Sequence, residues 1–437
     1  MRDEINLHWI WLAEKCGAAS RDFIPLIEKF ENPYEIYRLS TEETDRIPDI
    51  SDRLRHSLSD KSLEKSYRIY NFCTKNGIEI ITYGDRRYPE RLRALADPPV
   101  LFYVRGIFPD IEAKPAIGIV GTRKMSEYGM RAAYKITYEL TSAGFVAVSG
   151  MALGIDGVAS AAAIAAKGRQ VAVLGCGIDV TYPRQHARLM EQIIKNGAVI
   201  SEYAPGEPPN GYNFPKRNRL ISGLSKGVLV VEGAAGSGAL ITAEKAVAQG
   251  RMLFALTGKI NESNSEGPNE LIKNGAYVVS GTDDIIEKFS FLYADSIDYG
   301  AYKRAKHKSE PDAKLLNKLG VTGEEYRNAE KKPVLPKGEK TVAEEAAPVR
   351  AEKSVPVPVK ESAHSPAESS EAVREKILAG LDPASRAVYN AIPEGKMVSI
   401  DEISAGGFGV GEVLTSLTVL EITGLVKSVP GGAYIRI

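Results

Sequence analysis

The sequence predicts an α/β fold built on a parallel sheet, with a helical region before the sheet and a small module of helices and a hairpin after it. Two patterns in residues 114–290 indicate the sheet: apolar runs without polar alternation, and helical stretches that separate these runs. A third pattern lies in the turns, because several runs end in glycine-rich turns that open the next helix. Ligands of such sheets bind at the carboxyl ends of the strands, so these turns are where a functional site is expected.

Composition limits the classes of protein to consider. The chain has 437 residues, 43% of them hydrophobic, which is enough for two to four domains and a large core. Its 56 basic and 56 acidic residues balance, so net charge indicates no particular partner. The three cysteines, Cys16, Cys73 and Cys176, are too scattered for disulfides or a zinc site, which predicts a reducing cytoplasmic location. We expect no signal peptide, no membrane segment and no cofactor.

Residues 1–75 are expected to form a domain of short helices, since Leu7, Ile10 and Leu12 fall near helical spacing. This domain either provides contacts for a partner or is a packing appendage, and the second interpretation is favoured. Residues 76–290 form the sheet domain. Its predicted strands occupy residues 78–82, 100–104, 116–120, 145–149, 171–174, 198–201, 228–231, 252–255 and 277–279.

Residues 291–371 are rich in Pro, Glu, Lys, Ala and Ser, and we expect them to be a disordered linker. Order returns in residues 372–437. Ser385 is predicted to cap one helix, and Val413, Leu414, Leu417 and Leu420 give a later helix an apolar stripe. A hairpin is expected across the 430–432 turn. Helices followed by a hairpin are typical of a winged helix, which binds either nucleic acid or protein. The third helix has few cations, which argues against recognition of DNA by this helix.

Three glycine turns follow strands of the sheet domain. Gly121, Thr122 and Arg123 form the first turn, and Ser149 and Gly150 begin the second. The third contains Ser237 and Gly238. Backbone N–H groups at the start of a helix favour an anion such as phosphate. A single turn of this kind is equally well explained as an ordinary strand-to-helix connection, but three at one sheet edge favour an anion site.

A cluster of cations and an aromatic residue precedes the third turn. Its members are Phe214, Lys216, Arg217 and Arg219, with the amide of Asn218 between the two arginines. We interpret this cluster as a loop in which the aromatic ring stacks on a base while the cations hold phosphates. A solvated cationic loop without a ligand is the alternative. Together with the three turns, the cluster predicts a groove for nucleic acid.

Enzyme motifs find little support in this chain. The sequence around Ser225 matches G-x-S-x-G, but its strand comes after the serine rather than before it, which argues against a nucleophile. No P-loop or dinucleotide-binding fingerprint is present. An enzyme acting on nucleotides, such as a phosphoribohydrolase, stays open as an alternative. It would need an acid–base pair at the sheet edge, with Asp156, Glu202 or Glu232 as candidates.

From Tyr88 to about Ile286 the sequence resembles the DNA-processing protein A (DprA, also called Smf) family. Departures occur at Leu153 and Ser160, where the family usually has Arg and His. The matching pieces are Tyr88-Pro89 with Asp97-Pro98-Pro99, Val120 to Arg123 with Ser126 and Tyr128-Gly129, Ser149 to Ala152 with Gly154 to Asp156, Val171 to Gly175, Ile200 to Tyr203, Asn213 to Arg219, Ser237 to Thr242, and Gly267 to Asn269 with Leu271-Ile272.

The resemblance implies an extended Rossmann-like sheet domain that binds single-stranded DNA without a catalytic activity. It also implies a role in natural transformation and recombination, in which the protein protects incoming strands and helps load RecA recombinase. A homodimer is expected as well. The DNA groove would contain the 121–123 turn, Ser149-Gly150 and the 214–219 loop, and loss of a cation at Leu153 would weaken or reshape it. A third hypothesis makes the C-terminal module the main partner site and the sheet only a scaffold.

Overall fold

The computed structural model describes residues 2–30 and 32–322 continuously. Beyond them it describes 383–393, 398–399, 402–403, 408, 413, 416–417, 420, 425–429 and 433–436. The chain divides into two compact units, Met1–Ala343 and Glu344–Ile437. Among these residues, no helix combines the length and the apolar character needed to span a membrane.

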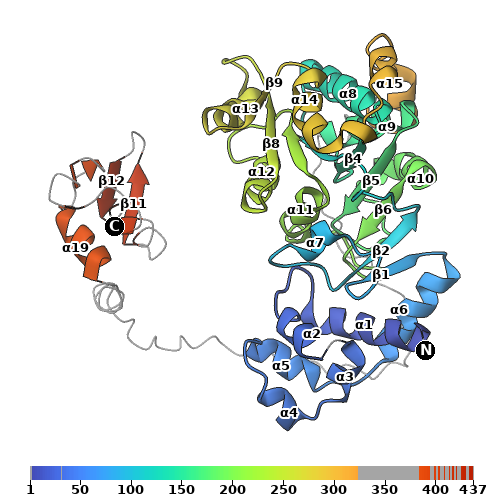
Figure 1. Cartoon of the computed structure of the whole chain (residues 1–437), viewed down its shortest axis with the longest axis vertical. Coiled ribbons are helices and arrows are strands. Elements are labelled where there is room, and N and C mark those ends of the chain that lie inside the picture. The colour runs from blue at the N-terminus through green and yellow to red at the C-terminus, as the bar shows by residue number, and fades with distance from the viewer. Residues whose placement is uncertain are drawn as a thin grey trace, which may run out of the picture. The chain divides into compact units, whose positions relative to one another are not determined.

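A nine-stranded sheet organises the first unit (Figure 1). Its order is β1-β2-β6-β5-β4-β3-β7-β8-β9; the strands from β6 to β9 run parallel, and β1 and β2 are antiparallel additions at one edge. All nine lie within two residues of their predicted positions. The bounds are β1 Glu79–Thr82, β2 Leu101–Gly106, β3 Ala116–Val120, β4 Val146–Ser149, β5 Arg169–Leu174, β6 Ala198–Ser201, β7 Gly227–Val230, β8 Met252–Leu256 and β9 Tyr277–Val279.

The strand order reverses direction at β3. From β3 the chain proceeds through β4, β5 and β6 on one side, and then returns to place β7, β8 and β9 on the other. Loops from β3 and β7 therefore diverge at the carboxyl edge, and such a reversal is where open α/β sheets bind ligands. This topology brings the three predicted glycine turns to one edge.

Helices cover both faces of the sheet. Alternate residues of β3 separate the two cores: Ile117 and Ile119 pack with α8 and α9, whereas Ala116 and Val120 belong to the core under α11 and α12. The helices of this domain are α7 Glu90–Arg93, α8 Glu127–Ser142, α9 Ile155–Ala165, η1 Arg184–His186, α10 Ala187–Asn196, α11 Asn213–Leu224, α12 Gly238–Ala248, α13 Ser263–Lys273, α14 Thr282–Tyr293 and η2 Ala294–Ser296.

The N-terminal domain is helical, as predicted, and lies beside β1 and β2 (Figure 1). Trp11 of α1 is fully buried and donates its indole N–H to the carbonyl oxygen of Asp60 at 2.9 Å. Phe23 packs edge-to-face on Tyr83, which joins this domain to the sheet domain. The helices are α1 Arg2–Cys16, α2 Ile24–Phe30, α3 Pro33–Arg38, α4 Thr41–Asp45, α5 Asp52–Leu58 and α6 Glu64–Lys75.

The start of the disordered linker is predicted too early, because ordered helices continue past residue 291. Two short helices, α15 Tyr299–Ala305 and α16 Ala313–Lys318, follow η2 and pack on α8 and α9. Tyr302, Leu316 and Val321 are buried there, so a few apolar residues anchor a stretch whose overall composition is polar. The expectation of disorder is wrong for residues 291–322, which include the end of α14 and η2, and the predicted linker residues 323–371 lie outside the described part.

The second unit contains helix α19 Pro383–Ala391 and a three-stranded sheet of order β10-β12-β11, with β10 Val398–Ser399, β11 Val426–Val429 and β12 Ala433–Arg436. The predicted hairpin is confirmed, because β11 and β12 pair antiparallel. Ser385 does not cap α19, since the helix already begins at Pro383. Val413, Leu417 and Leu420 are buried in the core of this unit, as their stripe predicted, and Leu414 lies outside the described residues.

Candidate nucleic-acid interface

The predicted 214–219 loop is the first half of helix α11. Pro215 lies in the first turn, where a residue without an N–H is tolerated because those groups have no partner within the helix. Helical spacing places Phe214 and Arg217 on one side, toward the sheet edge, and leaves Lys216 exposed. The sequence cluster is therefore divided between a buried face and a solvent face, a division that a loop assignment does not predict.

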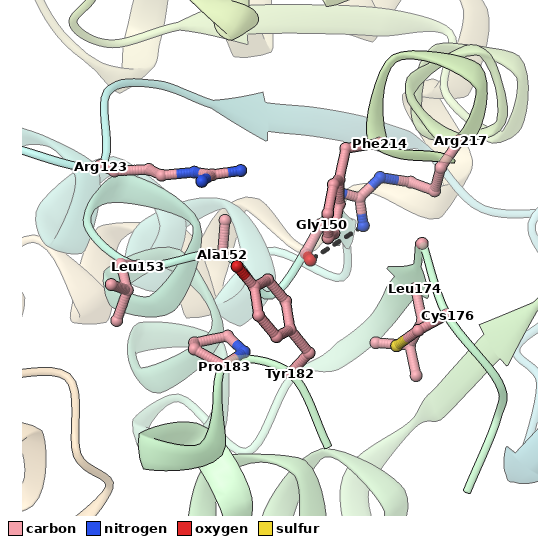
Figure 2. A pocket seen from close by; sticks show the side chains of 11 residues that line it. Arg123, Gly150, Ala152, Leu153, Leu174, Cys176, Tyr182, Pro183, Phe214 and Arg217 are labelled. Carbon is pink, nitrogen blue, oxygen red and sulfur yellow. Dashed lines mark hydrogen bonds between the residues drawn. The ribbon is translucent and has the colours of Figure 1, made fainter. Parts of the chain in front are cut away.

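Phe214 forms one side of a pocket at the carboxyl ends of β4 and β5 (Figure 2). Its ring lies 5.3 Å from that of Tyr182, centroid to centroid. A Cβ on Gly175 would come within 2.8 Å of the Phe214 ring, so glycine is required for the ring to sit here. The pocket is small, about 30 Å³, and is lined by Arg123, Gly150, Ala152, Leu153, Leu174, Gly175, Cys176, Tyr182, Pro183, Phe214 and Arg217.

Two guanidinium groups flank the Phe214 ring. The Cζ atoms of Arg123 and Arg217 lie 5.7 and 5.8 Å from its centroid, within the range of a cation–π interaction. Arg123 is exposed, whereas Arg217 is only 5% exposed and donates to the carbonyl oxygens of Gly150, at 3.0 Å, and Val173. Burial lowers the pKa of Arg217, and the nearby carboxylate of Asp156 counteracts this effect. Arg217 thus places positive charge beneath the ring without reaching solvent.

The turn at Ser149 and Gly150 does not present the N–H groups that the sequence suggested. The Gly150 N–H donates to Oδ2 of Asp156 at 2.9 Å, and the Ser149 hydroxyl lies 3.2 Å from that of Ser160. Burial raises the pKa of Asp156, and Arg217 opposes the shift. The prediction that this turn holds an anion is wrong for the Gly150 N–H, which an internal carboxylate already occupies. Gly150 instead shapes the pocket wall.

Hydrogen bonds to Glu232 also fix the 121–123 turn and the residues that follow it. The Thr122 N–H donates to the carbonyl oxygen of Glu232 at 2.8 Å. The Glu232 carboxylate accepts hydrogen bonds from the backbone N–H and the hydroxyl of Ser126. A Cβ on Gly129 would lie 2.2 Å from this carboxylate, so glycine is needed there. The contribution of this turn to an anion site is therefore the Arg123 side chain rather than the Thr122 N–H.

The third turn is the most open to solvent of the three. Gly236 has a φ of +72°, and both Gly236 and Gly238 are exposed. Ser237 is the N-cap of α12 without capping through its side chain, and its Oγ is buried with no hydrogen-bond partner among the described residues. Asn218 donates to the Gly238 carbonyl oxygen at 3.3 Å, which connects α11 to this turn. The positive end of α12 is accordingly available to an anion.

Arg219 has a structural role in this fold. It is 1% exposed, and its Nη2 donates to both carboxylate oxygens of Glu202 at 2.7 Å. Asp97 lies 3.5 Å from its Nε. Because Arg219 is buried and its charge is paired with two internal carboxylates, this structure gives its predicted DNA contact no support. Sequence reasoning in turn missed Tyr182, whose only signal was an aromatic residue shortly after the 171–174 strand.

Two family models match the chain. One is described as DNA recombination-mediator protein A and matches residues 79–290; the other is described as DprA winged helix domain and matches residues 361–432. The DNA processing protein DprA of Bacillus subtilis (strain 168) is 37% identical over 241 residues, which are 54% of this chain and 81% of the relative. The chain belongs to the DprA/Smf family.

Further DprA/Smf proteins agree over longer stretches. Protein Smf of Synechocystis is 33% identical over 362 residues, covering 82% of this chain and 80% of the relative. The X-ray structure of DNA processing protein A from Streptococcus pneumoniae aligns with a TM-score of 0.55 and 31% identity, over 65% of this chain and 98% of that one. The resemblance expected from the motifs is confirmed, and so are the parallel α/β sheet and the winged helix domain.

In this DprA/Smf protein, the groups that an enzyme would need have internal partners. Glu202 accepts hydrogen bonds from Arg219, and Glu232 accepts them from Ser126, as described above. The buried Ser225 hydroxyl donates to the Ile221 carbonyl oxygen at 2.8 Å. Burial raises the pKa of the Cys176 thiol to about 12, so the thiol stays protonated. Within the described part of the chain, the pocket lining includes no Asp or Glu, and no cluster of His, Cys, Asp or Glu suits a metal ion.

Proposed function

We propose that this protein binds single-stranded DNA at the carboxyl edge of its sheet. The arrangement around Phe214 carries the proposal: an aromatic ring, a second ring from Tyr182, and the guanidinium groups of Arg123 and Arg217 on either side. Aromatic rings stack on bases of any identity, and cations hold the neighbouring phosphates. Lys216 and the start of α12 add positive charge beside this arrangement.

A single strand fits this arrangement better than a duplex. Stacking on Phe214 needs the face of a base, and in a duplex that face is covered by the neighbouring base pairs.

The wider role follows from the family. We infer that the protein protects single strands and passes them to RecA recombinase in natural transformation and recombination, as a homodimer in the cytoplasm. The description of the matching model as a DNA recombination-mediator protein supports this inference. The hypothesis that the C-terminal unit is the main partner site and the sheet only a scaffold has less support, because the aromatic and cationic cluster described above belongs to the first unit.

Fluorescence anisotropy with a labelled thymine oligonucleotide at several salt concentrations tests the DNA site. We expect binding that weakens as salt rises, and a loss of roughly 5- to 150-fold in Phe214→Leu, the equivalent of about 1–3 kcal/mol for one stacked base. Phe72→Leu, an exposed phenylalanine on α6, is the matched control. Equal binding by Phe214→Leu and the parent would show that the site is misplaced.

A further inference from the structure

The segment that follows β8, residues 257–264, lies against the loop that carries Arg123. Asn264 donates from Nδ2 to the Lys124 carbonyl oxygen at 2.8 Å, and its own carbonyl oxygen accepts from the Gly233 N–H at 2.7 Å. The Tyr128 hydroxyl donates to the Thr257 carbonyl oxygen at 2.6 Å. Because β7 lies between β3 and β8 in the sheet, this segment crosses the end of β7 to reach the β3 loop.

Tyr128 is a fixed and accessible ring at this crossing. It is the second residue of α8, and its side chain is 50% exposed although its hydroxyl is held by Thr257. A ring already fixed in place loses little conformational entropy when it binds a flat partner. Tyr128 therefore has the accessibility and the rigidity of a stacking platform, and neither the fold nor the pocket around Phe214 accounts for its exposure.

The charges around Tyr128 suit a phosphate backbone. Lys124 and Lys259 are exposed on the two segments that meet here. The adjacent acid, Glu127, is paired with Arg131 at 3.0 Å, and Glu262 is the acid on the opposite segment. An exposed ring and exposed lysines on the two adjoining segments are the residue types that bind a single strand.

The two aromatic positions are joined by Arg123 and Lys124, consecutive in one loop. The Arg123 guanidinium lies 5.7 Å from the Phe214 ring, and the Lys124 carbonyl accepts from Asn264 of the second segment. Along the sheet edge the order is β5, β4, β3, β7, β8, with the pocket at β4 and β5 and Tyr128 between the ends of β3 and β8. A strand that stacks on Phe214 and follows these cations reaches Tyr128 next.

We propose that Tyr128 is a second base-stacking site of the same DNA strand, with Lys124 and Lys259 holding the phosphates beside it. The inference rests on the proposed single-stranded DNA binding and gives that binding a direction: the strand crosses the carboxyl edge from β5 toward β8. The site takes any unpaired base, because a ring without hydrogen-bond donors aimed at base edges reads only the base face.

Three substitutions test the stacking. Tyr128→Leu removes the aromatic ring and keeps apolar bulk; Tyr128→Phe keeps the ring and removes the bond to Thr257; Tyr67→Leu is a control at an equally exposed tyrosine on α6. With a thymine oligonucleotide long enough to span both rings, we expect roughly 5- to 150-fold weaker binding for Tyr128→Leu and less than about threefold for the other two. Binding by Tyr128→Leu equal to the parent would overturn the proposal.

Photochemical cross-linking gives a readout that does not depend on affinity. An oligonucleotide in which thymines are replaced by 5-iodouracil is bound to the full-length parent, and the complex is irradiated. The modified peptides are then identified by mass spectrometry. We expect cross-links at two places: at Tyr128, and in the pocket at either Phe214 or Tyr182. Cross-links confined to the pocket residues would overturn the second site and leave the proposed function intact, whereas absence of binding by the parent would overturn both.

Discussion

Arg219 and Glu202 form a buried ion pair, in which one guanidinium nitrogen, Nη2, donates to both carboxylate oxygens at 2.7 Å. The same carboxylate accepts the Ala19 N–H at 3.1 Å, from the turn between α1 and α2. One carboxylate at the end of β6 therefore connects the N-terminal domain to helix α11, which carries Phe214 and Arg217. This pair therefore fixes the position of the helix that carries part of the proposed DNA site.

We accordingly predict that Arg219→Ala acts mainly on stability. Removing one partner of a buried pair leaves the Glu202 charge uncompensated, which typically costs about 3–5 kcal/mol. Urea denaturation followed by circular dichroism measures the change in the free energy of unfolding. Lys216→Ala, three residues earlier and exposed, is the control and is expected to change stability by less than about 0.5 kcal/mol. Unchanged stability in Arg219→Ala with lost DNA binding would restore Arg219 as a DNA contact.

Gly175 provides a second test, because it is the neighbour that leaves room for the Phe214 ring. A Cβ at this position would lie 2.8 Å from the ring, so Gly175→Ala is expected to displace Phe214 and to weaken oligonucleotide binding roughly tenfold. Gly211→Ala is the control, since nothing lies within 4 Å of its added Cβ. Anisotropy titrations of both variants decide the matter; equal affinities would mean that the position of Phe214 is unimportant for binding.

The sequence predicted the framework of this site better than its details. Strands without polar alternation identified the sheet, and the glycine turns at their ends lie at one edge of it, as predicted. The turns themselves were misread, because nothing in the sequence around Gly150 shows that its N–H is taken by Asp156, six residues later in the chain. Such internal partners become visible only once helix α9 is packed against the sheet.

Arg217 and Arg219 illustrate the same limit. Both lie in a cationic cluster, and composition alone treats every cation of the cluster as solvent-exposed. Helical geometry turns Arg217 under Phe214, and carboxylates that are distant in sequence, Glu202 and Asp97, surround Arg219. The family resemblance covers the whole stretch and does not distinguish its exposed cations from those that the fold buries.

The exposed cations are expected to set the salt dependence of binding. For a single strand, removing one cation that neutralises a phosphate reduces the slope of log K against log salt by about 0.7. We predict this change for Lys216→Gln and for Arg123→Gln, and no change for Lys303→Gln on α15, which is also exposed. The slopes come from anisotropy titrations at four or more salt concentrations. Parallel lines for the parent and both site variants would exclude these phosphate interactions.

The nucleotide-processing alternative is tested by chemistry rather than by binding. Because Glu232 is buried and bonded to Ser126, we expect no release of free base when the protein is incubated with nucleoside monophosphates. Chromatography of the reaction products measures this release. Turnover by the parent that disappears in Glu232→Gln would establish an enzyme and overturn our assignment of Glu232 as a support for the 121–126 loop.

The buried His186 predicts how the fold responds to acid. Its Nδ1 lies 3.0 Å from the Met151 carbonyl oxygen, and its Nε2 is buried without a partner among the described residues. Burial lowers the pKa of His186 from its usual 6.5 to about 4, so the imidazole is neutral in the folded protein at neutral pH. The ring thereby supports the turn that carries Ala152 and Leu153 into the pocket.

We predict that His186 makes the protein lose stability as pH falls. His186 takes up a proton near pH 6.5 in the unfolded chain but only near pH 4 in the folded protein. The contribution of the neutral imidazole to stability is therefore complete above pH 6.5 and is lost by about pH 4. The shift corresponds to roughly 3 to 4 kcal/mol. His186→Gln keeps a donor for Met151 without this titration. Urea denaturation at a series of pH values should show a smaller loss for the variant than for the parent. The raised pKa of Asp156 has the opposite pH dependence and cancels in this comparison, so equal losses would contradict the prediction.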